Sequence, residues 1–243
     1  MTLQDNAALV TGASSGIGEA TAHALAREGA NVALAARRQE RLESIADDIE
    51  AAFGVETLAV PADVRDEAAV EAMVDTTVDA FGRLDVLVNN AGLGVGGDVA
   101  ETTSEQYRLM METNVDGVFF ATRAALPHLR ETAGNLVVVG SFAGQYPRPG
   151  NPIYAATKWW VRGFAHSLEG QIGPDGVGVS VVNPTEVRTE FGSEESESFE
   201  ERFESGEVAE PEEVADAVAF AAAQDRSTVH EIDLYRRDKF EGW

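Results

Sequence analysis

Tyr154 and Lys158 lie four residues apart in a stretch whose apolar residues follow a helical period. Residues at this spacing share one face of a helix, so the phenol and the ammonium can point into the same cleft. A nearby ammonium favours the phenolate and lowers the pKa of a tyrosine from about 10 toward the working pH. Tyr154 is therefore a candidate proton donor to a carbonyl and, in reverse, a base toward an alcohol. Chance pairs of this kind usually lie on a surface, but Lys158 is one of only two lysines in the chain.

A glycine-rich turn separates the first apolar run from the first helical stretch. It reads Thr11-Gly12-Ala-Ser-Ser-Gly16-Ile-Gly18. Glycines let a phosphate approach the backbone closely, and the N–H groups at a helix start attract anions. The alternative is a tight turn of the kind found in any α/β protein, but the strand and helix on either side favour phosphate binding. The residues expected to bind it are Gly12, Ser14, Ser15, Gly16, Ile17 and Gly18.

Two adjacent arginines, Arg37 and Arg38, follow the second apolar run, and no carboxylate occurs before Glu40. In dinucleotide-binding folds an acidic residue at this place binds the ribose 2′-hydroxyl of NAD, whereas an arginine accommodates the 2′-phosphate of NADP. Guanidinium groups bind phosphate bidentately. The alternative is a solvated helix start, although cations there oppose the helix macrodipole. The pair predicts NADP as the cofactor, with NAD as the less favoured choice.

Short apolar runs alternate with helical stretches along the chain. The predicted strands are residues 7–11, 31–36, 55–60, 84–89, 135–140, 177–183 and 231–235. The predicted helices are residues 17–28, 40–53, 67–81, 105–129, 153–172 and 211–223. Fully apolar strands between amphipathic helices indicate an α/β protein with a parallel sheet covered on both faces and right-handed connections, a doubly wound Rossmann fold.

Glycines mark four of the predicted helix ends. Gly29, Gly54, Gly82 and Gly134 each stand just before a strand, where a helix C-cap needs a positive φ. No shift in composition, long linker or repeat divides the chain, so residues 1–243 are predicted to form a single domain.

The charge of the chain is strongly acidic. Its 42 acidic and 18 basic side chains give a formal charge of −24. Phosphates would meet a surface of their own sign, which argues against nucleic acid and membrane surfaces as partners. The sequence has no Cys, no N-terminal targeting pattern and no apolar run that approaches the roughly 20 residues of a bilayer span. A cytoplasmic location is therefore expected.

The acid-rich, lysine-poor composition resembles that of soluble proteins from salt-accumulating halophiles. At molar salt the Debye length shrinks to roughly 3 Å, which screens the self-repulsion of such a surface. Stability and activity are predicted to rise with KCl.

The order of the motifs carries more information than any one of them. The phosphate turn is followed by Asn89-Asn90-Ala91-Gly92, then Asn114, Ser141 and Tyr154-x-x-x-Lys158. This order, from about residue 9 to the last strand, resembles that of the short-chain dehydrogenase/reductase family. The resemblance implies one Rossmann domain with a seven-stranded parallel sheet and a catalytic set of Asn114, Ser141, Tyr154 and Lys158. In that set Ser141 would hold the substrate oxygen, Lys158 would bind the nicotinamide ribose and polarise Tyr154, and Asn114 would hold a water in a proton relay.

The same resemblance implies further cofactor contacts. Ser14 and Arg37 would hold the 2′-phosphate. The remaining contacts are Arg38, Asp63, Val64, Asn90, Ala91, Gly92, Tyr154, Lys158, Pro184, Val187 and Thr189. Asp63 could instead cap the helical stretch that begins near Asp66. Thr185 stands where the family usually has a glycine after the sixth strand, and this difference is expected to alter how closely the loop approaches the nicotinamide.

Residues 190–210 are expected to form a mobile lid over the substrate, with a solvated acidic loop as the alternative. Family members commonly pair the helices at 105–129 and 153–172 between subunits, which implies a homodimer or homotetramer. At least one of Trp159 and Trp160 would then contact the neighbouring subunit. The four histidines, His23, His128, His166 and His230, show no metal-ligand spacing, so no metal is expected.

The predicted function is that of an NADP-dependent carbonyl reductase or alcohol dehydrogenase. It would act on a small, largely uncharged carbonyl or alcohol, with hydride passing to or from nicotinamide while Tyr154 transfers the proton. Three alternatives stay open: an NADP-sensing binding protein, an epimerase on the same scaffold, and an acidic interaction protein without cofactor.

Overall fold

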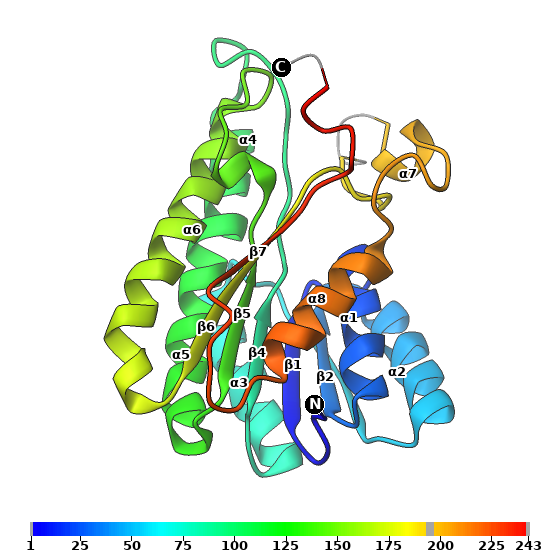
Figure 1. Cartoon of the computed structure of the whole chain (residues 1–243), viewed down its shortest axis with the longest axis vertical. Coiled ribbons are helices and arrows are strands. Elements are labelled where there is room, and N and C mark those ends of the chain that lie inside the picture. Colours follow the sequence, from blue (N-terminus) through cyan, green and yellow to red (C-terminus); the bar gives the residue numbers. More distant parts are fainter. Residues whose placement is uncertain (1, 193–196, 242–243) are drawn as a thin grey trace.

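The computed structural model describes residues 2–192 and 197–241 (Figure 1). Within them the strands form one seven-stranded sheet in the order β3-β2-β1-β4-β5-β6-β7, and every pairing is parallel. This confirms the predicted fold class. The strands are β1 (Ala7–Thr11), β2 (Asn31–Ala36), β3 (Thr57–Pro61), β4 (Val86–Asn89), β5 (Asn135–Val139), β6 (Gly178–Pro184) and β7 (Glu231–Leu234).

Helices cover both faces of the sheet, as Figure 1 shows. On one face lie α1 (Gly16–Arg27), α2 (Gln39–Phe53) and α8 (Pro211–Ala222). On the other lie α3 (Glu67–Phe81), α5 (Gly117–Thr132) and α6 (Pro152–Ile172). Side chains alternate along each strand, so Ala8 and Val10 of β1 enter the first core whereas Leu9 enters the second. An apolar layer therefore packs against each face of the sheet. The edge formed by the carboxyl ends of the strands remains available for a functional site.

Three of the four predicted glycine caps have the expected conformation. Gly29, Gly54 and Gly82 have φ values of +96°, +70° and +74°. The prediction for Gly134 is wrong, because the left-handed residue after α5 is Ala133, with φ +51°. Gly134 is needed for a different reason: a Cβ there would overlap the carbonyl oxygen of Asp85. Tight packing between neighbouring chain segments, rather than a positive φ, selects the glycine.

The helix predicted over residues 105–129 is interrupted. It consists of α4 (Ser104–Met111), a π-helical turn over Glu112–Asp116 and then α5. A π turn holds one residue more than an α turn, which the apolar periodicity does not reveal. Among the described residues, none of the helices combines the length and the apolar character that a bilayer crossing requires.

Candidate active site

A cleft opens at the carboxyl ends of the strands, where the strand order reverses between β1 and β4. In open α/β sheets this is the place where the loops diverge and ligands bind. The cleft has a volume of about 440 Å³, and its lining includes every predicted site residue except Gly18 and Asn114. The fold therefore brings together residues that the sequence spreads from Gly12 to Thr189.

The glycine turn wraps tightly round the end of β1. Gly12 and Gly16 have φ values of +67° and +56°, which other residues rarely adopt. A Cβ at Gly18 would overlap the carbonyl oxygen of Gly12, which explains why Gly18 lies behind the lining. Asn90 donates from its amide to the carbonyl of Thr11 at 2.9 Å, and the Thr11 hydroxyl accepts the backbone N–H of Asn90 at 3.0 Å. These bonds tie the turn to the loop after β4.

The start of α1 fits a phosphate group. Its N-cap residue Ser15 makes no side-chain hydrogen bond to the first turn within the described part of the chain. The first backbone N–H groups of a helix lack partners inside the helix, and the positive end of the macrodipole adds to their attraction for anions. Gly16 and Ile17 line the cleft at this point. The donors of the turn thus suit a dinucleotide pyrophosphate.

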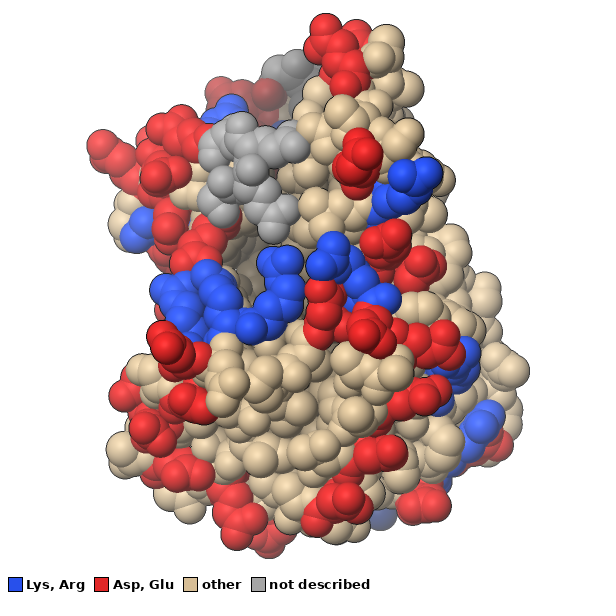
Figure 2. All heavy atoms as spheres, turned by 180° about the vertical axis from the view of Figure 1, so that it is seen from behind, with Lys and Arg blue, Asp and Glu red and all other residues tan. Residues whose placement is uncertain are grey.

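Basic side chains gather at the rim of the cleft although the protein as a whole is acidic. Figure 2 shows Lys and Arg side chains clustered along a hollow, with acidic side chains scattered over the rest of that face. Arg37, Arg38 and Arg65 belong to the lining. Concentrating positive charge here in a chain of charge −24 favours an anionic ligand.

Arg38 is held in place by both serines of the glycine turn. Its guanidinium donates to the Ser14 hydroxyl at 3.1 Å and to the Ser15 hydroxyl at 2.7 Å. It also pairs with Glu190 at 2.9 Å, and Arg41 pairs with the same carboxylate at 2.5 Å. Glu190 is a residue that sequence reasoning missed, because it lies far along the chain from the arginines that it bridges.

Asp63 is not the cap of α3. That role belongs to Asp66, whose carboxylate accepts the N–H groups of Ala68 and Ala69 at 3.0 and 3.2 Å. Asp63 instead pairs with the Arg65 guanidinium, which holds the pKa of the Asp63 carboxyl below its usual range. The helix-cap alternative for Asp63 is therefore wrong, and its carboxylate belongs to the cleft lining.

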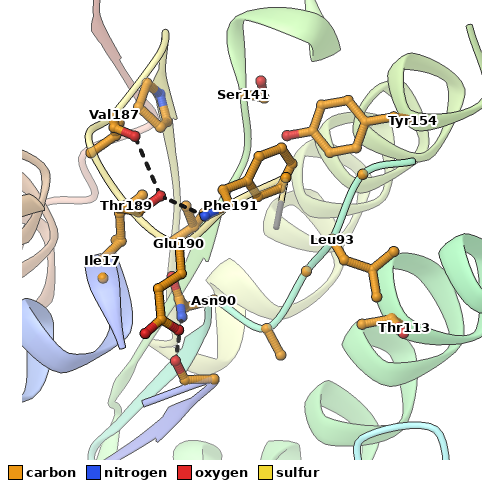
Figure 3. A pocket seen from close by; sticks show the side chains of 18 of the residues that line it. Ile17, Asn90, Leu93, Thr113, Ser141, Tyr154, Val187, Thr189, Glu190 and Phe191 are labelled. Atoms are coloured by element: carbon orange, nitrogen blue, oxygen red, sulfur yellow. Dashed lines mark hydrogen bonds between the residues drawn. The ribbon is translucent and has the colours of Figure 1, made fainter. Parts of the chain in front are cut away.

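Ser141 and Tyr154 face each other at the inner end of the cleft (Figure 3). Ser141 follows β5 and accepts the N–H of Ala143 at 3.1 Å. Tyr154 lies in the first turn of α6, where Asn151 caps the helix by accepting the Tyr154 N–H at 3.3 Å. The phenol ring packs edge-on against Phe191, with ring centres 5.6 Å apart. Two hydroxyl groups from different elements thus meet at one point.

Lys158 lies one turn after Tyr154 and is buried. Its ammonium donates to the carbonyl oxygen of Val139 at 2.8 Å and lies 5.9 Å from the centre of the Tyr154 ring. Burial lowers the pKa of Lys158 to about 8, because the charged form loses hydration. The shared helix face predicted from the spacing is confirmed by this contact.

The predicted direction of the Tyr154 pKa is wrong for this structure. Burial of the hydroxyl raises the pKa of Tyr154 above its usual value, and the hydrogen bond with Ser141 and the charge of Arg148 only partly oppose that effect. The physical reason is that desolvation of the phenolate outweighs the neighbouring charges. The Lys158 ammonium is hydrogen-bonded to the Val139 carbonyl and does not offset the effect of burial on the Tyr154 phenolate.

Asn114 sits in the π turn behind the cleft. Its amide oxygen accepts the N–H of Leu93 at 2.9 Å, and its amide nitrogen donates to the Leu93 carbonyl at 2.8 Å and to the Thr157 hydroxyl at 3.0 Å. Thr157 in turn donates to the Tyr154 carbonyl at 2.7 Å. The π turn therefore places one side chain that joins α6 to the cleft loop.

The loop after β6 completes the cleft. Thr189 accepts the N–H of Phe191 and donates to the Val187 carbonyl, as drawn in Figure 3, and its side chain lies against Gly16. Thr185, where the resemblance implies a glycine, accepts the N–H of Arg236 at 3.1 Å. This hydrogen bond thus anchors the loop to the segment that follows β7.

A charged group and an aromatic group line the outer end of the cleft. Lys239 is buried, pairs with both oxygens of Glu186 at 2.6 and 2.8 Å, and lies 4.6 Å from the Phe142 ring centre. Burial of Glu186 opposes its ionisation, but the Lys239 ammonium keeps the pKa of Glu186 below its usual range. Sequence reasoning missed Lys239, and its only signal was the scarcity of lysine.

The expected lid begins with a short aromatic ladder. Phe191 packs on Phe199, and Phe199 packs on Phe203, with ring centres 5.6 and 5.8 Å apart. Phe199 is the first residue of the short helix α7 (Phe199–Arg202). Residues 193–196 of this stretch lie outside the described residues.

Comparison with known proteins agrees with the geometry. A family model described as short chain dehydrogenase matches residues 6–200. The meso-2,3-butanediol dehydrogenase of Serratia marcescens is 36% identical over 238 residues, 96% of this chain and 94% of that protein. An alcohol dehydrogenase from the archaeon Thermococcus sibiricus, complexed with 5-hydroxy-NADP, has a TM-score of 0.87 at 34% identity, covering 94% of this chain and 95% of the other. A 3-ketoacyl-(acyl-carrier-protein) reductase from Brucella melitensis, complexed with NADH, has a TM-score of 0.87 at 31% identity, covering 98% and 100%.

The likeness extends over nearly the whole chain, and the range matched by the family model, residues 6–200, contains the glycine turn, Ser141 and Tyr154. The fold, the family model and the relatives thus point to the same class of protein. The chain belongs to the short-chain dehydrogenase family, oxidoreductases that act on CH–OH groups with a nicotinamide cofactor.

Proposed function

We propose that this protein is an NADP-dependent carbonyl reductase or alcohol dehydrogenase that acts on a small, largely uncharged substrate. The observation that carries the proposal is one cleft with arginines at one end and the Ser141 and Tyr154 hydroxyls at the other. A bound nicotinamide would supply or accept the hydride.

Each residue at the inner end has a role that its contacts support. Ser141, fixed by its place at the end of β5, holds the substrate oxygen. Tyr154 gives a proton to that oxygen in reduction and takes one from it in oxidation. Lys158 would donate to the nicotinamide ribose, because its ammonium lies beside Tyr154, one helical turn further along α6. Asn114 positions Leu93 and, through Thr157, the start of α6.

The preference for NADP rests on the arginines at the rim. Arg37 and Arg38 lie where the adenosine 2′-phosphate of NADP would enter, and Ser14 adds a hydroxyl donor beside them. The Thermococcus relative is complexed with an NADP derivative, whereas the Brucella relative is complexed with NADH. Because these relatives differ in cofactor, the proposed preference for NADP rests on the arginines.

The outer end of the cleft supports a small substrate of low charge. Leu93, Phe142, Phe191 and Phe199 supply apolar walls. The Glu186 carboxylate is neutralised by Lys239 and is approached by Arg148 at 3.7 Å. Residues 190–210 would close over this end as a lid, and the Phe191–Phe199 contact would be part of its inner surface.

The exposed aromatic face of α5 and α6 supports a homo-oligomer. Phe119, Trp159 and Trp160 remain exposed by 36% or more in the single chain, and Trp160 stacks on Phe164 at 4.8 Å. Large exposed aromatics on neighbouring helices are typical of protein interfaces. Gel filtration in molar KCl tests this, and a monomer would contradict it.

The experiment compares the wild type with Tyr154→Phe. NADPH binding is followed by fluorescence, and turnover by absorbance at 340 nm with a panel of aldehydes, ketones, sugars and hydroxy acids in molar KCl. We expect Tyr154→Phe to bind NADPH as the wild type does and to lose turnover by roughly a hundredfold or more. NADPH binding without turnover of any substrate would favour a sensor, and turnover without net cofactor consumption would favour an epimerase. Absence of NADPH binding would favour an interaction protein.

A further inference from the structure

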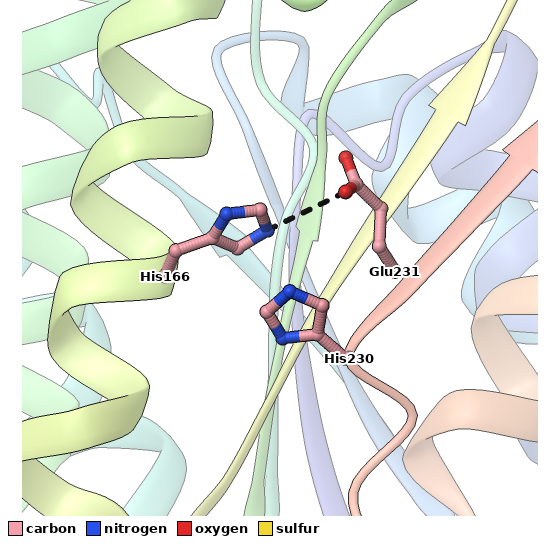
Figure 4. Close-up of side chains that lie close together, drawn as sticks. All are labelled: His166, His230 and Glu231. Atoms are coloured by element: carbon pink, nitrogen blue, oxygen red, sulfur yellow. Dashed lines mark ion pairs between the residues drawn. The ribbon is translucent and has the colours of Figure 1, made fainter.

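Three potential metal ligands gather at the junction of α6 and β7. They are His166 on α6, His230 just before β7, and Glu231 at the first position of β7. One ligand atom from each lies within 4.8 Å of the other two (Figure 4). None of the three is among the described residues that line the cleft. The cluster is therefore separate from the site proposed for catalysis.

The ring of His230 is oriented by a carboxylate. Its Nδ1 forms a 2.6 Å hydrogen bond with Glu169, also on α6. When Nδ1 donates to a carboxylate, Nε2 carries the lone pair, and this is the usual arrangement behind a metal-bound histidine. His230 thus has a second partner that fixes its tautomer and makes its other nitrogen a better donor to a metal.

The Nε2 atom of His166 is buried and has no hydrogen-bond partner among the described residues. Its nearest acid is Glu231, with Nε2 3.6 Å from Oε2. The two imidazole rings stack with their centres 4.3 Å apart and their planes inclined by 25°, so one ring must turn before both can bind the same ion in the ring plane. An unpaired buried nitrogen of this kind costs free energy unless something binds it.

Glu231 is held by hydrogen-bond donors on both carboxylate oxygens. Its Oε1 accepts from Arg162 at 2.7 Å, from Gln145 at 2.9 Å and from Asn183 at 2.5 Å. Its Oε2 also accepts from Arg162, at 2.9 Å, and faces His166. One oxygen is thus saturated with donors, and the other is turned toward the histidines.

The local charge is also suitable for a cation. Glu169, Glu231 and Asp233 carry three negative charges around the cluster, and Arg162 carries the positive charge closest to them. A divalent ion would therefore enter a net negative environment rather than a neutral one.

We propose that His166, His230 and Glu231 bind one divalent transition-metal ion of the zinc type, with water as the fourth ligand. Imidazole nitrogens with one carboxylate suit Zn²⁺ and disfavour Mg²⁺ and Ca²⁺, which prefer oxygen ligands. Bonds of roughly 2.0–2.1 Å in tetrahedral geometry place the ligand atoms about 3.3 Å apart, so the three groups must draw together and the His230 ring must turn out of its stack on His166. His230, whose side chain is 57% exposed, has room to do so.

The ion would fasten β7 to α6, the helix whose first turns carry Tyr154 and Lys158. Its role is structural, since the cluster lies outside the cleft. Zinc would then raise the unfolding temperature without taking part in turnover. The inference does not depend on the proposed reaction, because binding and unfolding are measured without substrate.

The test uses the full chain without an affinity tag, treated with chelator and then dialysed. Zn²⁺ binding is measured by calorimetry, Co²⁺ binding by the visible absorption of a tetrahedral site, and unfolding by calorimetric scanning with Zn²⁺ or Mg²⁺. The variants are His230→Gln, His166→Gln and the control His128→Gln, which changes a histidine outside the cluster. Far-ultraviolet circular dichroism of each variant reports whether the fold is intact.

We expect one Zn²⁺ per chain, a higher unfolding temperature with Zn²⁺ than with Mg²⁺, and an affinity reduced by roughly tenfold or more in His230→Gln. His128→Gln should match the wild type. Equal affinity in His230→Gln, no Zn²⁺ uptake by the wild type, or an equal effect of Mg²⁺ would overturn the inference. If His166→Gln does not fold, the exposed His230 still decides the question. Loss of NADPH turnover with intact zinc binding would count only against the proposed function.

Discussion

The ammonium of Lys158 donates a 2.8 Å hydrogen bond to the carbonyl oxygen of Val139. Val139 ends β5 and Lys158 lies on α6, so the bond ties the helix of the candidate active site to the carboxyl edge of the sheet. The same placement buries a positive charge. Its cost is visible in the pKa of Lys158, which burial lowers to about 8.

Lys158→Met should stabilise the protein at pH 7 while abolishing turnover. Burying the charged Lys158 side chain lowers its pKa from 10.5 to about 8, which costs about 3 kcal/mol of folding free energy at pH 7 that methionine avoids. The variant would leave the Val139 carbonyl without its hydrogen bond, which costs about 1–3 kcal/mol. Between pH 8 and the unfolded-state value of 10.5 the unfolded chain binds more protons, so wild-type stability rises with pH there. The advantage of Lys158→Met should therefore be largest below pH 8 and shrink above it. Thermal unfolding from pH 6 to 10 checks this, and a variant less stable at every pH would contradict it.

Glu190→Gln should tighten NADPH binding by roughly two- to fivefold, since exposed ion pairs contribute up to about 1 kcal/mol. The Glu190 carboxylate now pairs with Arg38 and Arg41, and an incoming 2′-phosphate would compete with it. NADH, which lacks that phosphate, should bind as before. Fluorescence titration with both cofactors measures the difference. Glu43→Gln is the matched control, because it removes the same charge from α2, where Glu43 bonds to Gln39. Equal tightening toward NADH would refute the competition.

Asn114→Ala should lower the free energy of unfolding by about 2 kcal/mol or more, because buried partners lose their hydrogen bonds. The affected groups are the backbone of Leu93 and the hydroxyl of Thr157. Amide exchange at Leu93 should accelerate. Thr157→Val removes the contact with α6 and keeps the bonds to Leu93, so its Leu93 amide should exchange at the wild-type rate. Unchanged exchange at Leu93 in Asn114→Ala would show that the π turn does not hold this loop.

The unfolding temperature should rise between dilute buffer and molar KCl. The net charge of −24 is spread over the surface, and added salt shortens the range of repulsion from roughly 8 Å at physiological strength to roughly 3 Å at 1 M. Scanning calorimetry at increasing KCl measures the trend, with sucrose at matched osmolality as the control. Equal or greater stability in salt-free buffer would remove the hypothesis of salt adaptation.

The sequence was sufficient to predict the sheet and most of the cleft because those features depend on local patterns. Strand runs, cap glycines and the Tyr154–Lys158 spacing act over a few residues, and the family order of motifs joins them. The bridge from Glu190 to Arg38 and Arg41 was not predictable, since it depends on how a distant loop folds back.

The histidines illustrate the same limit. His166 and His230 are 64 positions apart, so metal-ligand spacing along the chain has no means of finding them. Only the pairing of β7 beside β6, under α6, brings them together. The predicted direction of the Tyr154 pKa shift was also wrong. A neighbour in the sequence gives no information on how much water a folded cleft excludes.

The π turn over Glu112–Asp116 has a consequence for how this chain can change. Deleting one residue there would let α4 and α5 merge into an ordinary helix, with regular hydrogen bonding regained and the Asn114 amide rotated by roughly 100° away from Leu93. A shorter and more stable chain that no longer holds the Leu93 loop is thus one deletion away, and selection for stability alone would favour it.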